Sequence, residues 1–260
     1  MKVLVIGDRI FDQYSYCKAT RLCPEGPAPV LIVEKEATSE GGASLVAENL
    51  KSLLGPQSVL TEFGSVSRKH RIFADRTLIC RIDKDSFSIA DRDAFWGQCL
   101  VKMKQSDIVV VSDYGKEGLT FGLAAGINSY CLENNKKLFV DCKGPNINAY
   151  YGCFALFPNE GEHNGINPEL WQHIIRKIGP KGCSVDGKLV PTVEVQEVYD
   201  VTGAGDVFLA AFVWQYIVGA GDGFLAEIDR LTDAAIMANK AASISVRHLG
   251  TYIAKPQELL

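Results

Sequence analysis

Three short apolar runs, each followed by an aspartate, constrain the fold of this chain most strongly. The runs and their acids are residues 3–6 with Asp8, residues 108–111 with Asp113, and residues 138–140 with Asp141. Continuous runs rich in β-branched residues are typical of parallel strands that are buried on both faces. Because the carboxyl ends of parallel strands meet at one edge of a sheet, we expect the three aspartates to converge on a ligand site there.

The segments between these runs predict an α/β domain with an interleaved lid. Residues 90–104 and 119–134 are long enough for crossover helices, so strand and helix alternate as in a doubly wound sheet. Two other regions break this alternation, and both favour extended chain with prolines at edges or turns. We predict a single domain over residues 1–260, with a small separate lid sheet from about residues 11–35 and 69–83.

Composition narrows the classes of partner. The formal net charge of −4 argues against broad attraction to nucleic acid or anionic lipid. The first apolar run meets Asp8 too early to be a signal peptide or membrane span. Eight scattered cysteines are typical of reduced thiols in a chain of 260 residues. We therefore expect a cytoplasmic protein that binds neither nucleic acid nor membrane.

Residues 200–206, Asp-Val-Thr-Gly-Ala-Gly-Asp, carry the clearest chemical signal. They precede an apolar run that meets no helix breaker until Gly219. Small residues at a helix entrance leave the first amides open to an anion, which the helix dipole also favours. Asp206, in the first turn, could accept the proton of an attacking hydroxyl while those amides stabilise a transferred phosphoryl group. An ordinary glycine-rich turn before a helix is the alternative that this pattern leaves open.

Two other nucleotide-binding patterns fail at their chemistry. Residues 182–188 satisfy Gly-x-x-x-x-Gly-Lys, but Leu189 stands where a P-loop needs the hydroxyl of Ser or Thr. The segment is better interpreted as a hairpin that turns at Asp186-Gly187. Residues 7–12 lack the Gly-x-Gly-x-x-Gly fingerprint of dinucleotide-binding enzymes after the first strand.

The 200–206 stretch resembles the C-terminal signature of the ribokinase-like (PfkB) carbohydrate kinases. Further segments resemble one branch, the D-glycero-D-manno-heptose-7-phosphate kinases of lipopolysaccharide heptose biosynthesis, and they run in the same order along nearly the whole chain. These segments are residues 7–12, 20–30, 41–47, 69–83, 112–116, 141–144, 158–162, 238–242 and 249–251.

The resemblance implies a ribokinase-like three-layer αβα sandwich with a mostly parallel central sheet and a β-sheet lid, often paired with a second copy as a homodimer. It implies transfer of the γ-phosphoryl group of ATP to a sugar hydroxyl, most readily the anomeric hydroxyl of D-glycero-D-manno-heptose 7-phosphate. ATP and Mg²⁺ would be the cofactors, and the need for a monovalent cation stays open.

The resemblance also assigns roles to single residues. Asp206 would be the catalytic base, with Gly203, Ala204 and Gly205 forming the anion hole. The residues that would bind the sugar or a phosphate are Asp12, Gly41, Gly42, Arg71, Asp113, Lys116 and Lys143. Those near the nucleotide would be Asn159, Lys177, Gly179, Gly182, Thr202 and Asn239. Glu162 would organise Mg²⁺ through water. Solvated surface for the basic residues, and a helix N-cap for Asn159, are the alternatives.

The chain departs from the family pattern in three places. Leu45 stands where the family has a substrate-contacting asparagine, and loss of such a hydrogen bond in a buried site is worth ~1–3 kcal/mol. The chain is also shortened between Leu60 and Lys69, and again between Glu162 and Ile174. The sequence therefore leaves two alternatives open: a kinase for another sugar or sugar phosphate, and a non-catalytic protein that binds sugar or nucleotide.

Overall fold

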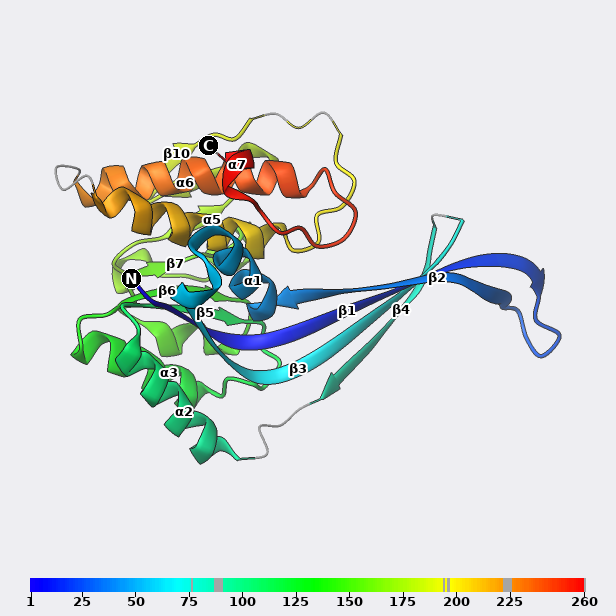
Figure 1. Ribbon diagram of the computed structural model, residues 1–260, viewed down its shortest axis with the longest axis horizontal. Helices are drawn as coiled ribbons and strands as arrows, with labels where there is room; N and C mark the ends of the chain where they lie inside the picture. Colours follow the sequence, from blue (N-terminus) through cyan, green and yellow to red (C-terminus); the bar gives the residue numbers. More distant parts are fainter. Residues whose placement is uncertain (76, 87–90, 194, 196, 222–225, 260) are drawn as a thin grey trace.

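A seven-stranded, mostly parallel sheet organises the chain (Figure 1). The computed structural model describes residues 1–260 except 76, 87–90, 194, 196, 222–225 and 260. The strand order is β4-β3-β1-β5-β6-β7, with β2 also paired to β1. The strands are β1 (Val3–Leu22), β2 (Pro29–Gly42), β3 (Val59–Ala74), β4 (Thr77–Ser86), β5 (Ile108–Asp113), β6 (Lys137–Cys142) and β7 (Ala155–Leu156).

Helices cover both faces of this sheet, as the αβα prediction requires (Figure 1). One hydrophobic cluster joins the sheet to α1, α5, α6 and α7, and a second joins it to α2 and α3. The helices are α1 (Ala43–Leu54), α2 (Arg92–Gln105), α3 (Phe121–Glu133), α4 (Glu160–His163), α5 (Ala204–Val218), α6 (Glu227–Ser245) and α7 (Pro256–Leu259). Short 3-10 helices are η1 (Pro56–Ser58), η2 (Pro145–Tyr150), η3 (Pro168–Leu170), η4 (Gly179–Lys181) and η5 (Gly219–Gly221).

Helix α5, which carries Asp206 in its first turn, is buried on almost all sides. Its residues from Asp206 to Trp214 are all buried, and its aromatic side chains pack against those of the sheet. A helix that is apolar on all sides is stable only inside a core, and α5 lies inside the core of this chain. The core therefore fixes the position and direction of α5 at the carboxyl edge of the sheet.

Strand β1 passes from the core into the lid without a break. It pairs with β5 only as far as Gly7 opposite Ser112, and from Arg9 opposite Gly42 it pairs with β2 instead. Strand β3 stays beside it from Val3 to Cys17, with one register shift after Gly7. The prediction of a separate lid sheet was wrong: the lid is a continuation of the central sheet. The physical reason is that β1 and β3 contain no proline to interrupt their hydrogen bonds, so both ladders continue outward.

The lid strands project beyond the helical layers as a long arm (Figure 1). They are longer than the predicted ranges of 11–35 and 69–83, because β2 runs to Gly42 and β4 to Ser86; residue 76 lies outside the described residues. The shortened stretch after Leu60 is a single strand, β3, that runs directly from core to lid. Alternation along β1 turns Asp12, Tyr14 and Tyr16 to one face of the arm, since every second residue shares a face.

Most other predicted elements are confirmed. The helix expected at residues 119–134 is α3, and that expected at 90–104 is α2, although residue 90 lies outside the described residues. A small second sheet contains β8 (Ile175–Lys177), β9 (Cys183–Val185) and β10 (Lys188–Val190). Its β9–β10 hairpin turns at Asp186 and Gly187, both with positive φ, as the Asp-Gly signal predicts.

Burial governs the chemistry of the cysteines. All eight are free thiols, and burial raises the pKa of Cys131 and of Cys183 to about 12, so these thiols stay protonated and unreactive at neutral pH. The described helices include none that is both long enough and apolar enough to cross a membrane.

Close contact between β1 and β5 makes Gly7 a sensitive position. A Cβ atom at Gly7 would lie 2.0 Å from the carbonyl oxygen of Ser112, so Gly7→Ala must push the two central strands apart. We expect this change to lower the free energy of unfolding by about 2–3 kcal/mol or more, measured by urea denaturation. The control is Gly122→Ala in α3, where a Cβ meets nothing within 4 Å. An equal, small effect of both substitutions would contradict the account.

Candidate active site

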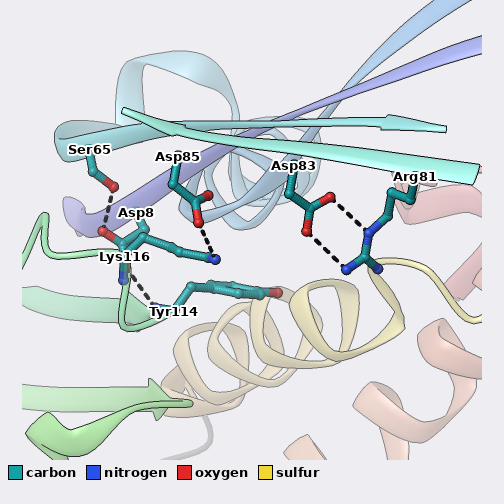
Figure 2. Close-up of polar contacts among 7 residues, drawn as sticks. All are labelled: Asp8, Ser65, Arg81, Asp83, Asp85, Tyr114 and Lys116. Carbon is teal, nitrogen blue, oxygen red and sulfur yellow. Dashed lines mark hydrogen bonds and ion pairs between the residues drawn. The ribbon is translucent and has the colours of Figure 1, made fainter. Parts of the chain in front are cut away.

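The carboxylate of Asp8 ties together three segments at the carboxyl edge of the sheet. Asp8 is fully buried and follows the last residue of β1 that pairs with β5. Its Oδ1 accepts a hydrogen bond from the Ser65 hydroxyl (2.7 Å), and its Oδ2 accepts the amides of Tyr114 (2.9 Å) and Lys116 (3.1 Å) (Figure 2). Asp8 therefore fixes the loop after β5 against both lid-forming strands.

The second strand-end aspartate, Asp113, supports the same loop from the other side. Its carboxylate accepts the Gly115 amide (2.9 Å), the Asn146 side-chain amide (3.0 Å) and the Tyr150 hydroxyl (3.0 Å). Burial raises the pKa of Asp113, which is fully enclosed. Its oxygens are thus occupied within the protein, and its predicted contact with substrate stays a prediction.

Asp206 lies in the first turn of α5, where the sequence predicted a general base. Gly203 is the N-cap with φ of 75°, a left-handed conformation that favours glycine. The Ala204 amide donates to the Val201 carbonyl (3.2 Å), so it is already used within the turn. The amides of Gly203, Gly205 and Asp206 donate to no group in the described part of the chain, so they are available as donors of an anion hole. The hole predicted from Gly203, Ala204 and Gly205 thus loses the Ala204 amide.

Tyr114 contacts the buried carboxylate directly. Its hydroxyl lies 2.8 Å from Asp206 Oδ1 and 2.9 Å from Oδ2. The Lys143 ammonium group lies 3.6 Å from the centre of the Tyr114 ring, and that of Lys69 lies 5.8 Å from it. Figure 2 shows Asp83 and Asp85 projecting from β4 toward the loop that carries Tyr114. The tyrosine thus lies between the lid and the entrance of α5.

The charges around Asp206 set its acidity. Asp206 is 2% exposed, and burial raises its pKa to about 6, against the lowering effect of Lys143 and Lys177 and of the Tyr114 hydrogen bond. Asp141 raises the pKa further, although its Oδ2 accepts a hydrogen bond from the Lys177 ammonium at 2.7 Å. A pKa near neutrality suits a general base, because the ionised form dominates at pH 7 while retaining affinity for a proton.

The predicted sugar-binding residues gather on the lid side. Arg71 on β3 pairs with the buried Asp12 on β1. A Cβ at Gly41 would lie 2.7 Å from Asp12 Oδ2, and one at Gly42 would lie 2.6 Å from the Asp8 carbonyl oxygen. Because neither glycine has a side chain, the backbone at the start of α1 can lie in close contact with Asp12 and Asp8.

Two lysines belong to the same region. Lys116, on the loop after β5, pairs with Asp85 of β4 at 2.8 Å and so links the loop to the lid (Figure 2). Lys143 follows β6 and donates its backbone amide to the Asp113 carbonyl (2.8 Å). The structure therefore brings the predicted lid and strand-end residues together, while their binding roles remain predictions.

Asn159 and Glu162 form a capping box at the start of α4. The Glu162 carboxylate accepts the Asn159 backbone amide (2.8 Å) and side-chain amide (2.7 Å), and Asn159 Oδ1 accepts the Glu162 amide (2.9 Å). The N-cap alternative thus describes their contacts, and their Mg²⁺ role stays a prediction. The described residues contain no cluster of three acidic, histidine or cysteine side chains that could hold a metal. The partly exposed Glu162 carboxylate fits an ion held by ATP phosphates and reached through water.

The other predicted nucleotide residues have structural contacts. Gly179 and Gly182 have positive φ, and a Cβ at Gly182 would lie 2.4 Å from the Val190 carbonyl oxygen. Asn239 is buried in α6 and donates to that same carbonyl at 2.9 Å. Thr202 donates its amide to Asp200 Oδ1 at 2.9 Å. Lys177 also lies near the hole, since a Cβ at Gly205 would lie 3.8 Å from its Nζ.

Leu45 replaces a polar contact with packing. Its side chain is fully buried, and a Cβ at Gly203 would lie 2.5 Å from Leu45 Cδ2. The leucine therefore fills the space directly beneath the N-cap of α5. At the position where the family resemblance expects an asparagine, this chain presents an apolar surface to the anion hole.

Sequence reasoning gave no role to two residues that hold the site together, Tyr114 and Asp200, and predicted only the location of a third, Asp8. Asp200 accepts the amides of both Thr202 (2.9 Å) and Gly250 (3.0 Å). The strand-then-aspartate pattern placed Asp8 at this edge of the sheet, and the adjacent motif could have identified Asp200. No local signal marks Tyr114, because its role arises from a contact with a residue 92 positions away.

Comparisons with known proteins agree with this geometry. Residues 163–258 match the model of the pfkB family carbohydrate kinases. The bifunctional protein HldE of Helicobacter pylori (strain P12) is 30% identical over 312 aligned residues, covering 99% of this chain and 66% of HldE. HldE of Geobacter metallireducens is also 30% identical, over 100% of this chain and 62% of that protein. The chain belongs to the pfkB family of carbohydrate kinases.

Solved structures of this family confirm the predicted fold. Ribokinase from Giardia lamblia has a TM-score of 0.74 at 16% identity, covering 99% of this chain and 97% of that one. Ribokinase from Arabidopsis thaliana, complexed with ribose and ATP, has a TM-score of 0.67 at 16% identity, covering 99% and 97%. The predicted ribokinase-like α/β fold is therefore confirmed. The chain spans slightly less than two thirds of the length of the HldE relatives.

The acidity of Asp206 can be measured without any substrate. We expect a carboxyl group that titrates at a pH of about 6 in ¹³C NMR spectra, and that is absent from Asp206→Asn. Lys143→Met should move this titration to higher pH, because the ammonium favours the ionised form. Lys188→Met, at an exposed position on β10, serves as the control. Titration of Asp206 near pH 4 would show that burial does not control its pKa.

Proposed function

We propose that this protein is an ATP-dependent sugar kinase in which Asp206 is the general base. The observation that carries the proposal is a buried carboxylate, with a pKa raised to about 6, beside the amides of Gly203, Gly205 and Asp206, which donate to no group among the described residues. Base and anion hole thus lie beside each other at the carboxyl edge of the sheet. That arrangement suits phosphoryl transfer, which depends mainly on positioning and electrostatic stabilisation.

In this mechanism the acceptor sugar lies under the lid, near Asp12 and the backbone of Gly41 and Gly42. Asp206 accepts the proton of the attacking hydroxyl as its oxygen bonds to the γ-phosphorus of ATP, and ADP leaves in line. The amides of Gly203, Gly205 and Asp206 stabilise the charge that develops on the transferred group. Lys177, close to Gly205, supplies a positive charge on the same side.

Mg²⁺ would neutralise part of the phosphate charge when it is bound with ATP. Asn159 and Glu162 are the residues proposed to reach it through water. Their capping box holds the Glu162 carboxylate in one orientation while leaving it partly accessible to solvent. The backbone of Asn159 forms a bridge with Lys177, which connects this capping box to the charged groups around Asp206.

The acceptor we propose is the anomeric hydroxyl of D-glycero-D-manno-heptose 7-phosphate. The motif resemblance to the heptose-7-phosphate kinases and the whole-chain similarity to HldE proteins support this choice. Leu45 favours a second candidate, another sugar or sugar phosphate, because an apolar side chain cannot replace the hydrogen bond of an asparagine. A panel that contains both groups of substrates distinguishes them.

The test is a screen of sugars and sugar phosphates with Mg-ATP, in which ADP release is measured. We expect turnover with at least one acceptor, and a loss of ~10²–10⁴-fold in rate for Asp206→Asn with acceptor binding retained. Asp93→Asn is the matched control, since Asp93 also lies in the first turn of a helix but is exposed. Near-normal turnover by Asp206→Asn would remove Asp206 as the base. Binding without turnover across the panel would favour the non-catalytic alternative.

We also propose that the lid pairs with a second copy of the chain. Several large apolar side chains on the lid strands are exposed: Leu22, Ile32, Val33, Leu78, Ile79 and Ile82. Clusters of exposed apolar residues of this kind mark association surfaces. In sedimentation velocity we expect a dimer, which Ile82→Asp should shift toward monomer. Val101→Asp, at an exposed position on α2, should leave it unchanged. A strict monomer in the unmodified protein would contradict the proposal.

A further inference from the structure

Tyr114 occupies the position that an acceptor hydroxyl must reach. Its single phenolic proton is shared between the two oxygens of Asp206, at 2.8 Å and 2.9 Å. An acceptor can transfer its proton to Asp206 only by approaching one of those same oxygens. The hydroxyl of Tyr114 therefore stands where the hydroxyl of the substrate has to be.

The tyrosine is held in this place by the backbone on one side and by a cation on the other. The Tyr114 amide donates to Asp8 Oδ2, and the next residue, Gly115, has φ of 65° and donates to Asp113 Oδ1. The ring then lies 3.6 Å from the Lys143 ammonium group. These contacts fix the ring through groups other than its hydroxyl, so the hydroxyl can change partner without moving the loop.

A tyrosine at this point is chemically inert toward ATP. Burial, with the nearby charge of Asp206, raises the pKa of the Tyr114 phenol well above its usual range. The phenol therefore stays protonated and is a poor nucleophile. A water molecule in the same position would be a competent acceptor: its oxygen would bond to the γ-phosphorus, ADP would leave, and its proton would pass to Asp206, giving ADP and inorganic phosphate.

We propose that the Tyr114 hydroxyl blocks the access of water to Asp206 when no sugar is bound. When the sugar binds, Tyr114 gives up its hydrogen bond to one oxygen of Asp206, and the acceptor hydroxyl takes its place. Tyr114 is thus a positioning residue that makes phosphoryl transfer depend on the acceptor. This inference rests on the proposed kinase activity, since it needs ATP beside Asp206. It identifies how the site would avoid wasteful hydrolysis of ATP.

Hydrolysis of Mg-ATP without sugar tests the inference. Tyr114→Phe keeps the ring over which Lys143 lies and removes only the hydroxyl, so we expect sugar-free release of inorganic phosphate to rise by about 10-fold or more. The rise should vanish in Tyr114→Phe combined with Asp206→Asn, because the water needs the base. Tyr151→Phe is the matched control, since that exposed hydroxyl contacts only Asn148 among the described residues.

The pH profile separates this role from a merely structural one. The groups that face Asp206 are Tyr114 after β5, Asp141 and Lys143 at the end of β6, and Lys177 on β8. The phenol donates to the carboxylate and so favours its ionised form, which means that its loss raises the pKa of Asp206. The acid limb of the pH profile of sugar-free hydrolysis by Tyr114→Phe should therefore lie at higher pH than that of the unmodified protein. A simple loss of structure would lower hydrolysis at every pH.

The outcomes distinguish this inference from the proposed function. Unchanged hydrolysis in Tyr114→Phe, with Mg-ATP still bound, overturns the inference and leaves the kinase proposal intact. A rise that depends on Asp206, in a protein that phosphorylates no sugar in the panel, supports the inference and overturns the acceptor assignment. Failure of the unmodified protein to bind Mg-ATP overturns both. Tyr114→Leu, which also lacks the hydroxyl, replaces Tyr114→Phe if the latter does not fold, and the same rise is expected.

Discussion

The buried carboxylate of Asp8 is the interaction on which the geometry of the site depends. A buried carboxylate costs several kcal/mol unless donors replace its hydration, and three donors surround this one. Those donors come from β3 and from the loop after β5, while Asp8 itself lies on β1. One side chain therefore satisfies its own charge only when three segments, distant in sequence, meet at the point where the core sheet becomes the lid.

Continuity of β1 and β3 connects the lid to the turn that carries Asp206. The lid contributes Asp12, Arg71 and Asp85, and the last of these holds Lys116 at 2.8 Å. Lys116 lies two residues from Tyr114, which contacts Asp206. Side-chain contacts and one short loop therefore join the lid strands to Asp206. A lid on a separate sheet would lack that connection.

The sequence predicted the parts of the fold that depend on local pattern. Uninterrupted apolar runs identified the central strands, the Asp186-Gly187 pair identified a hairpin, and the small residues before Asp206 identified the entrance of α5. The exchange of partners along β1 could not be predicted, because strand pairing depends on register between distant segments. The capping box at Asn159 was visible in the sequence as Asn-x-x-Glu. The same pattern also fitted a Mg²⁺ role, so the sequence alone did not decide between a helix cap and a metal site.

The same distinction applies to the candidate site. The type and position of Asp206 follow from the sequence, but its acidity does not, since acidity depends on burial and on charges from β6 and β8. Lys143 and Lys177 favour the ionised carboxylate, whereas Asp141 opposes them, and Lys177 is itself paired with Asp141. This pairing makes the effects of Lys177 and Asp141 on the carboxylate oppose each other, and burial, the largest cause, determines the direction of the shift against Lys143. A site with two unpaired lysines would instead keep Asp206 strongly acidic and a weak base. The Asp141–Lys177 pair therefore matters for the acidity of Asp206, although neither residue contacts the carboxylate through a hydrogen bond in the described structure.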